Sequence, residues 1–367
     1  MKLLLLDQYS DPGGAQQALM EILPAIRERG WGARIGLPGG GELFGRVEKL
    51  GFETAKVTCG PYRAGAKSLG DLGRFARDTP RLAAEVRRLA AGTDLVHVNG
   101  PRLLPGVALA RAHTPVLFHS HSLVPAGRMR EVAGMALRRL GASVVAACEF
   151  VAAPWREFLP GDRVHVVYNG VAGPPAAIWR PGTLVVGCIG RYAPEKGQLE
   201  FVRAARQIAA ALPESRFTIH GAPLFGDAGA ERYQERVRAE ASGLPVEFAG
   251  WTPDVYQALA RIGLLLAPSA GNEATTRVIL EAFAAGVPVI AFRSGGIPEV
   301  IEHGRTGWLV DSVDEMARLA IGLLSDREKM TSVSRAARRS WEARFNQRRY
   351  QHDLLERMEA AARGGAA

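Results

Sequence analysis

Short apolar runs alternate with amphipathic stretches along nearly the whole chain, and this alternation constrains the fold more than any other feature. A first series of strand-like runs covers residues 2–7, 33–37, 94–99, 115–120, 143–148 and 164–169. A second series covers residues 183–190, 216–221, 246–250, 263–269, 288–292 and 307–310. Helical patterns lie between the runs, for example at 15–29, 69–91, 199–212 and 314–324. Strands that alternate with helices predict βα units and parallel sheets.

The two series predict two domains, because 367 residues are enough for two cores of ordinary size. Between the series, residues 171–182 are rich in Gly, Pro and Ala and lose the periodicity. We therefore predict an α/β chain with two doubly wound Rossmann-like domains, at 1–170 and 183–340, facing a cleft. Residues 171–182 are the predicted linker. Residues 341–367 are expected to form a charged helix that crosses back to the first domain and frays at its last residues.

The composition is typical of a soluble globular protein, with 47% apolar and 23% charged residues. No apolar run approaches the roughly 20 residues that a membrane helix needs. The leucine run at residues 3–6 leads directly into Asp7, so it is interpreted as a first strand and not as a signal peptide. The three cysteines are far apart and form no CxxC pair, which favours buried thiols in the cytoplasm.

The charge is distributed unevenly between the two halves. Residues 1–180 contain 23 Lys and Arg against 15 Asp and Glu, a balance of +8, whereas the remainder contains 23 against 22, a balance of +1. A basic half suggests contact with an anionic membrane surface at the inner face of the membrane, or with an acidic acceptor. A solvated surface without a partner is the alternative. Nucleic acid is disfavoured, because no nucleic-acid motif is present.

Two loops of the first half are candidates for ligand contact. Gly13 and Gly14 lie between the first strand and a helix, where backbone N–H groups can approach a phosphate or a sugar closely. A tight βα turn explains the same residues equally well. His119 and His121 end a middle strand, and either could bind a sugar hydroxyl or orient an acceptor. We expect the two rings to point in opposite directions, so that only one faces the site. A histidine with a purely structural role is the alternative.

The second half opens with a strand, a turn and a helix that carry two cations. Gly190 and Arg191 follow the strand, and Lys196 precedes the helix. Cations at a strand end can neutralise a diphosphate leaving group. The loops at 221–227 and 251–254 could hold a nucleotide base, although Trp251 could equally be a packing residue.

Two carboxylates eight positions apart, Glu273 and Glu281, flank the start of another predicted helix. Thr275 or Thr276 can cap this helix, and Gly286 is placed to end it. A helix N-terminus suits phosphate, and carboxylates beside it can accept hydrogen bonds from sugar hydroxyls. The combination favours a sugar that is joined to a diphosphate.

Taken in order, several segments resemble the pattern of glycosyltransferase family 4, whose members are retaining, nucleotide-sugar-dependent enzymes with the GT-B fold. They are GRYAPEKG at 190–197, HGAPLFGD at 220–227, EFAGWTPD at 247–254, LAPS at 266–269, the Glu273/Glu281 pair and GGIPEVIEHGRTGWLV at 295–310. The resemblance covers the whole chain and is strongest from about residue 190 to residue 310. The chain departs from the pattern at Thr275 and Thr276, where many members have an aromatic residue and a glycine.

The resemblance implies a role for each candidate residue. Glu273 would contact the donor sugar, and Glu281 the ribose. Arg191 and Lys196 would bind the diphosphate. The glycine-rich first loop of the family corresponds to Gly13 and Gly14, and its first-domain histidine to His119 or His121. Gly190, Thr275 and Thr276 complete the expected donor site.

The sequence therefore predicts a hexosyltransferase that uses a nucleotide diphosphate sugar and a hydroxyl acceptor. Its expected setting is the glycosylation of cell-surface glycans, glycolipids or secondary metabolites. UDP is favoured over GDP, and neither an essential metal nor another cofactor is expected. Front-face displacement is the expected mechanism, because no carboxylate is placed as a covalent nucleophile. A nucleotide-sugar epimerase and a non-catalytic sugar-nucleotide binding protein are the alternatives.

Overall fold

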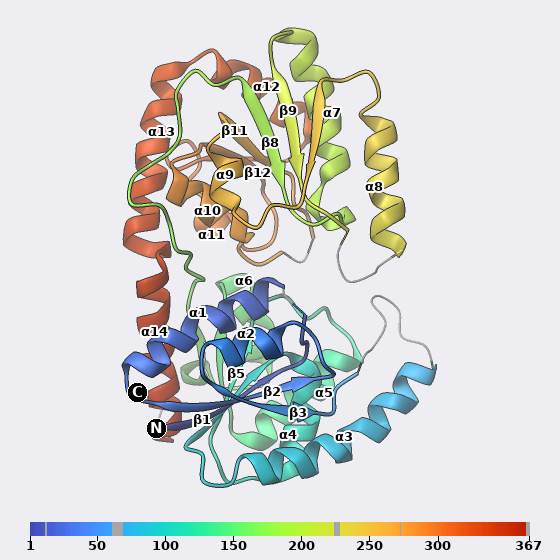
Figure 1. Ribbon diagram of the computed structural model, residues 1–367, viewed down its shortest axis with the longest axis vertical. Coiled ribbons are helices and arrows are strands. Elements are labelled where there is room, and N and C mark those ends of the chain that lie inside the picture. Colours follow the sequence, from blue (N-terminus) through green and yellow to red (C-terminus); the bar gives the residue numbers. More distant parts are fainter. Residues whose placement is uncertain (12, 61–68, 224–227, 272, 365–367) are drawn as a thin grey trace. The chain divides into compact units, whose positions relative to one another are not determined.

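The computed structural model describes residues 1–11, 13–60, 69–223, 228–271 and 273–364 (Figure 1). These residues divide into two units, each built around its own parallel sheet. The first unit contains Met1–Tyr168 and the chain from Tyr350 onward, and the second unit contains Asn169–Arg349. Two parallel α/β sheets confirm the fold class that the alternating pattern predicts.

The first unit has a seven-stranded sheet with the order β3-β2-β1-β4-β5-β6-β7. Its strands are β1 (Lys2–Asp7), β2 (Gly32–Pro38), β3 (Glu53–Val57), β4 (Leu95–Asn99), β5 (Val116–Ser120), β6 (Ser143–Ala146) and β7 (Val164–Val166). In register, Asp7 at the end of β1 lies beside Asn99 at the end of β4. The strand order reverses between β1 and β4, and ligands of such sheets bind beyond the carboxyl ends of the strands at this point.

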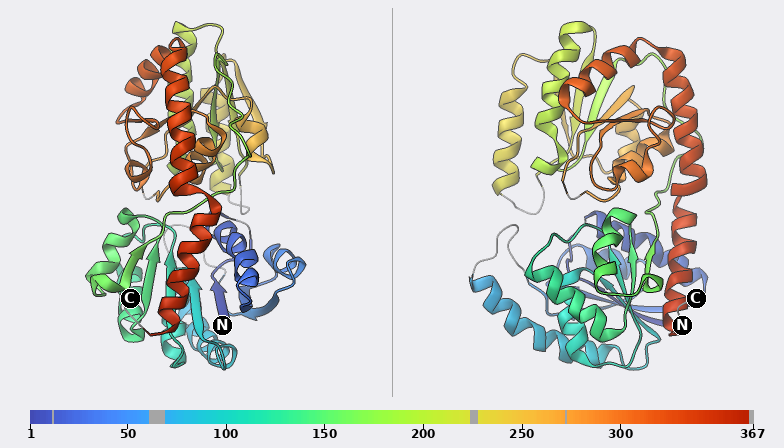
Figure 2. Two further views of the ribbon diagram at one scale, coloured as in Figure 1. Left: turned by 90° about the vertical axis from the view of Figure 1, so that its left-hand side faces the viewer. Right: turned by 180° about the vertical axis from the view of Figure 1, so that it is seen from behind.

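Helices cover both faces of this sheet (Figure 2). They are α1 (Gly14–Glu28), α2 (Leu43–Lys49), α3 (Leu69–Leu89), α4 (Leu104–Ala110), α5 (Arg128–Leu140), the short α6 (Glu149–Ala152) and most of α14 (Gln347–Ala362), with 3-10 turns at Pro101–Leu103, Ala153–Glu157 and Gly161–Arg163. One face packs on α1, α2 and α14, as Leu3 and Leu5 of β1 share a core with Leu354 of α14. Leu4 and Leu6, which alternate with them, are also fully buried. Burial on both faces explains the unbroken leucine run.

The second unit has a six-stranded sheet with the order β10-β9-β8-β11-β12-β13. Its strands are β8 (Val185–Ile189), β9 (Arg216–His220), β10 (Val246–Gly250), β11 (Leu264–Ala267), β12 (Val289–Phe292) and β13 (Trp308–Val310). Its helical elements are a 3-10 turn (Pro194–Lys196), α7 (Gln198–Ala211), α8 (Ala228–Glu240), α9 (Val255–Leu259), α10 (Arg277–Ala285), α11 (Ile297–Val300), α12 (Val313–Leu324), α13 (Arg327–Ser340) and a π-turn (Trp341–Phe345). Here too the strand order reverses, between β8 and β11.

The residues that the sequence assigns to the linker and to the last helix are both held by specific polar contacts. Val171 accepts a hydrogen bond from the indole nitrogen of Trp341 at 3.1 Å, and its own N–H donates to the carbonyl of Phe345 at 2.9 Å. Residues 171–182 therefore form part of the second unit. From Tyr350 onward α14 packs in the first unit, where Arg29 pairs with Glu356. The end of the tail, at 365–367, lies outside the described residues.

Two further predictions are tested by the folded chain. Cys59, Cys148 and Cys188 are all buried thiols, as predicted. Among the described residues, no helix is both long enough and apolar enough to cross a membrane.

Candidate active site

The candidate donor site lies at the carboxyl ends of β8, β11 and β12, which are neighbours in the second sheet. The segment from Gly190 to the 3-10 turn follows β8, the segment with Glu273 follows β11, and Ser294 to Gly296 follow β12. Because the strands are parallel, these three loops meet at one edge of the sheet. The residues that the sequence singles out in this half are thus brought together by topology.

Lys196 and Glu273 form the central contact of this edge. The Lys196 Nζ lies 2.9 Å from Glu273 Oε1, and both side chains are largely buried, with 20% and 16% of their surface exposed. The Thr276 hydroxyl donates to the other carboxylate oxygen of Glu273 at 3.2 Å. The predicted phosphate cation and the predicted sugar-binding carboxylate are therefore partners of one another.

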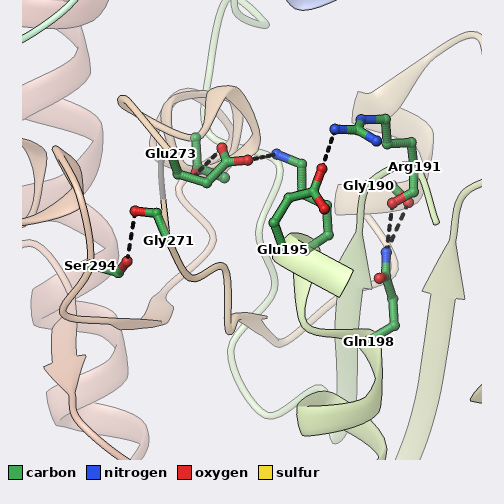
Figure 3. A network of polar contacts seen from close by, with 9 residues as sticks. Gly190, Arg191, Glu195, Gln198, Gly271, Glu273 and Ser294 are labelled. Atoms are coloured by element: carbon green, nitrogen blue, oxygen red, sulfur yellow. Dashed lines mark hydrogen bonds and ion pairs between the residues drawn. The ribbon is translucent and has the colours of Figure 1, made fainter. Parts of the chain in front are cut away.

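Arg191 is also paired with a carboxylate. Its Nη2 lies 2.5 Å from Glu195 Oε1, and both side chains are about two-fifths exposed. The Gln198 side chain donates to the carbonyls of Gly190 and Arg191, at 3.3 and 2.9 Å, and so holds the turn (Figure 3). Sequence reasoning missed Glu195 and Gln198 as site residues. The signal available was a polar residue, Gln198, at the start of an amphipathic helix, where the structure buries it fully.

Two glycines fix the backbone around Glu273. Gly295 has φ +56°, and a Cβ added there would lie 2.0 Å from the Glu273 carbonyl oxygen. The same carbonyl accepts a hydrogen bond from the N–H of Gly296 at 3.1 Å. Gly197 has φ +71°, and its Cβ would lie 2.1 Å from the carbonyl of Pro268. Only glycine allows both the conformation and the close approach at these two positions.

The helix that follows Glu273 differs at its start from the prediction. α10 begins at Arg277 and Thr276 takes the N-cap position, but no side chain accepts a hydrogen bond from its first N–H groups. The predicted threonine cap is therefore wrong. The Thr276 hydroxyl is turned toward the Glu273 carboxylate, to which it donates. The Thr275 hydroxyl is buried without a hydrogen-bond partner. Gly286 ends the helix in the left-handed conformation, as predicted.

Glu281 lies in the second turn of α10 and has a partner that sequence reasoning missed. Its Oε1 accepts from Arg277 Nε at 2.9 Å, and 14% of the glutamate side chain is exposed. The uncapped first turn of α10 and Glu281 belong to the same short helix. The donor-site carboxylates thus flank a helix N-terminus, which is favourable for an anion.

In the first unit, Gly13 and Gly14 form the start of α1. Gly13 is its N-cap residue, the first turn contains no acidic residue, and a Cβ at Gly14 would meet nothing within 4 Å. Pro12, in the same loop, lies outside the described residues. Gly13 and Gly14 therefore lead into the helix, with space beside Gly14. These glycines belong to the first unit, and the candidates around Glu273 belong to the second.

A buried carboxyl group lies behind this loop and was not anticipated. Asp7 is fully buried at the end of β1, where its Oδ1 accepts from Gln16 at 2.8 Å and from the Tyr9 N–H at 2.8 Å, and its Oδ2 accepts from Asn99. Burial raises the pKa of Asp7 to about 6, and these hydrogen bonds oppose the rise. Asp7 and Asn99 are 92 residues apart, so sequence spacing offers no signal for their contact.

The two predicted histidines lie together, so the expectation that they point in opposite directions is wrong. Their ring centroids are 3.8 Å apart. Residues i and i+2 of a strand project from the same face, which explains the contact. His119 is 2% exposed, whereas His121 is partly exposed.

A third histidine joins this cluster from the neighbouring strand. The His97 ring of β4 packs edge-on against His119, with centroids 5.6 Å apart. Neither ring nitrogen of His97 has a hydrogen-bond partner in the described structure. Burial lowers the pKa of His97 to about 3 and that of His121 to about 4, and it holds the pKa of His119 well below its ordinary value. All three imidazoles are therefore neutral at pH 7.

The loops predicted to hold a base are described only in part. Residues 224–227 lie outside the described residues. Trp251, which follows β10, is 60% exposed, so it is not a packing residue of the core. Over the described ranges, no group of three or more His, Cys, Asp or Glu side chains is arranged to hold a metal ion.

Comparison with known proteins gives the family. Residues 12–172 match the model described as Glycosyltransferase Family 4, and residues 183–326 match Glycosyl transferases group 1. The chain belongs to glycosyltransferase family 4. The family resemblance and the enzyme class predicted from the sequence are thereby confirmed, and family members use nucleotide-sugar donors.

Several relatives are similar to this family 4 chain. A GDP-mannose-dependent alpha-(1-6)-phosphatidylinositol monomannoside mannosyltransferase of Mycobacterium tuberculosis is 37% identical over 170 residues, and the match spans 42% of each chain. The putative glycosyltransferase YtcC of Bacillus subtilis is 26% identical over 294 residues, covering 72% of this chain and 71% of YtcC. The crystal structure of Anabaena Alr3699/HepE in complex with UDP has a TM-score of 0.82 at 26% identity, covering 98% of this chain and all of HepE.

Proposed function

We propose that this chain is a retaining glycosyltransferase that moves a hexosyl group from a nucleotide diphosphate sugar to a hydroxyl acceptor. The observation that carries the proposal is the 2.9 Å ion pair between Lys196 and Glu273, contributed by two neighbouring strand ends. A lysine beside an uncapped helix N-terminus suits the charge that develops on a leaving diphosphate. A carboxylate in the same place suits the hydroxyls of the sugar that the diphosphate releases.

The proposed reaction is a front-face displacement. The acceptor oxygen forms its bond to the anomeric carbon on the face from which the diphosphate departs, and the acceptor proton passes to the departing phosphate oxygen. Arg191, Lys196 and the first N–H groups of α10 stabilise the charge on the diphosphate. Glu273 already pairs with Lys196 and accepts from Thr276, so its role is to hold the sugar and not to attack it.

On the acceptor side, we assign the hydroxyl-binding histidine to His121. It is the partly exposed member of the cluster, whereas His119 is buried beneath it at 3.8 Å. A neutral imidazole can accept a hydrogen bond from a hydroxyl or donate one to it. His119 then supports the ring of His121 by packing.

The base of the donor is open to a direct test. HepE is described in complex with UDP, and the mycobacterial relative is described as GDP-mannose-dependent. We propose UDP and retain GDP as the alternative. A thermal-shift screen of both nucleotides and their sugars distinguishes them, because a ligand at 100 times its Kd adds about 2.7 kcal/mol to the stability of the folded state.

The test of the function is Lys196→Ala, assayed for transfer with the donor that the screen identifies. Losing one charge-stabilising donor commonly lowers the rate about 100-fold. Arg203→Ala is the matched control, because Arg203 is an exposed cation of α7 in the same unit, paired with Glu200. Wild-type turnover in Lys196→Ala would contradict the proposal. The anomeric configuration of the product, read by NMR, tests retention.

Two rival functions give different products in the same assay. A nucleotide-sugar epimerase needs no acceptor, so it would convert the donor when the donor is incubated alone. A non-catalytic binding protein would bind the donor and form no product. Neither outcome is compatible with acceptor-dependent transfer.

We further propose that the first unit docks on an anionic membrane surface through the outward face of α5. Met129, Val132 and Met135 of this helix are 42%, 38% and 59% exposed, which is high for large apolar side chains. With about 100° per residue, Arg128 and Arg139 lie within about 40° of Met135 on the helix circumference. Apolar side chains among arginines fit a surface of anionic lipid.

Vesicle sedimentation tests this docking. Vesicles with phosphatidylglycerol should bind the wild type at low salt and release it at 1 M salt, where the Debye length falls to about 3 Å. The double variant R128E/R139E should lose this binding. R335E/R339E on α13 makes the same charge change at exposed positions of the second unit and should bind normally. Equal binding by both variants, or no binding by the wild type, would leave the basic half as solvated surface.

A further inference from the structure

Arg277 is the first residue of α10 and the cation nearest in sequence to the helix N-terminus of the candidate donor site. Its Nε lies 2.9 Å from Glu281 Oε1, and the two side chains are 27% and 14% exposed. An exposed pair four residues apart on a helix adds little to stability. This pair is more buried and belongs to the helix proposed to receive the diphosphate, so its position suggests a role in the site.

Charge balance gives that role a physical basis. The proposed site must accept an anionic diphosphate, yet two carboxylates, Glu273 and Glu281, flank the same helix N-terminus. Carboxylates close to a phosphate repel it unless their charge is compensated. Lys196 compensates Glu273 at 2.9 Å, and Arg277 compensates Glu281 at the same distance.

Geometry adds a second element to the argument. A glutamate side chain has several rotatable bonds, and a hydrogen bond from a neighbouring turn restricts them. The contact from Arg277 reaches Glu281 across one helical turn, so both groups move with the same rigid element. A carboxylate that is held in one orientation binds a pair of adjacent hydroxyls better than one that must be ordered on binding.

We propose that Arg277 is a positioning residue for the donor nucleotide. It holds the Glu281 carboxylate in the orientation that meets the ribose hydroxyls, and it offsets the repulsion between that carboxylate and the diphosphate. The inference rests on the proposed function, because it needs a nucleotide in this site. Arg277 acts through Glu281 and does not contact the reacting atoms.

The quantity to measure is the ratio between the Kd of a nucleotide that lacks the ribose hydroxyls and the Kd of the ribose nucleotide. Calorimetry compares UDP with 2′,3′-dideoxyuridine diphosphate, and GDP with its dideoxy analogue in parallel. The wild type should prefer the ribose nucleotide by at least about 10-fold, the amount expected for hydrogen bonds to a charged group. Arg277→Met should lose most of this preference, and Glu281→Gln should lose it to a similar extent. The double variant should lose no more than either single variant.

Two controls separate positioning from stability. Arg363→Met removes an arginine that pairs with a glutamate four residues away, at the end of α14. It should leave the ribose preference unchanged. Arg277→Lys keeps the charge and changes the geometry, so its preference for the ribose nucleotide should be intermediate. This variant replaces Arg277→Met in the test if Arg277→Met does not fold.

The outcomes are distinct. Full ribose preference in Arg277→Met would overturn the inference and leave the proposed function intact. Equal weakening of UDP and its dideoxy analogue would overturn the positioning role, because it would leave Arg277 with only an electrostatic effect on the diphosphate. A wild type that binds neither UDP nor GDP would overturn the proposed function together with this inference.

Discussion

The replacement His97→Phe should make the chain more stable at pH 7 and less sensitive to acid. His97 is 1% exposed, and neither of its ring nitrogens has a hydrogen-bond partner in the described structure. Phenylalanine has a similar shape and no polar atom, so the replacement removes the desolvation cost of an unsatisfied group, which is about 1–3 kcal/mol. The edge-on contact with His119 can be kept by the new ring.

The acid sensitivity follows from the direction of the pKa shifts. The pKa of His97 falls from 6.5 to about 3 on folding, so the unfolded chain binds its proton first as the pH drops. The contribution of one such histidine to the free energy of unfolding is fully present above pH 6.5. Below pH 6.5 the free energy of unfolding falls by about 1.4 kcal/mol per pH unit. His119, whose pKa is lowered by burial in the same direction, makes this slope steeper.

Two other groups, Asp7 and His121, also change the pH dependence of the free energy of unfolding. Asp7 has a pKa raised from 3.8 to about 6, so its protonation favours the folded state and offsets about 1.4 kcal/mol per unit between pH 6 and pH 4. His121, with a pKa of about 4, acts like His97 and lowers the stability as the pH falls. Its effect is smaller than that of His97 because its side chain is partly exposed. His97 alone offsets the contribution of Asp7 between pH 6 and pH 4, so His119 and His121 leave a net loss of stability as the pH falls.

The assay is urea denaturation followed by circular dichroism at pH 7, 6, 5 and 4.5. His97→Phe should reduce the slope of unfolding free energy against pH by about 1.4 kcal/mol per unit. His113→Gln is the control, because His113 is exposed in the loop after α4, and its slope should equal that of the wild type. A His97→Phe slope equal to that of the wild type would refute the view that His97 is held neutral by burial.

The remaining predictions concern the donor site. Glu281→Gln should weaken the binding of the free nucleoside diphosphate, whereas Glu273→Gln should leave that binding nearly unchanged and impair transfer; calorimetry with the opposite pattern would exchange the two roles. Arg191→Ala should lower turnover with the fold intact, by less than Lys196→Ala, because Arg191 is the more exposed cation; steady-state kinetics of both variants decides. Gly295→Ala should destabilise the second unit by about 2 kcal/mol or more, since it forces a left-handed residue against the Glu273 carbonyl; unchanged thermal unfolding would count against the close approach.

The sequence predicts the sheets well where the strands are buried on both faces. The leucine run of β1 is continuous because helices cover both sides of it. β3 is absent from the predicted strands because its sequence ETAKV has one large apolar residue, Val57, and lies at the edge of the sheet. The candidate donor residues could be found because they follow strands in parallel order, so that topology alone brings Lys196 and Glu273 together.

The contacts within the sites could not be predicted in the same way. Asp7, Asn99 and His97 lie within strand sequences that read as ordinary core, and their partners come from other strands. The capping prediction at Thr276 was wrong, since the hydroxyl of this residue is turned toward the Glu273 carboxylate. Sequence spacing specifies neighbours along an element, whereas these contacts depend on the register between elements.

The three ion pairs at the donor edge have a consequence for which ligands can be selected. Arg191, Lys196 and Arg277 each pair with a carboxylate. A ligand that binds Arg191 and Lys196 in place of their glutamates must supply about as much negative charge as the two carboxylates do. A diphosphate can replace two such partners at once, and a monophosphate replaces fewer. The resident carboxylates thus compete with the phosphate groups for these cations, so a nucleoside monophosphate should inhibit more weakly than a nucleoside diphosphate.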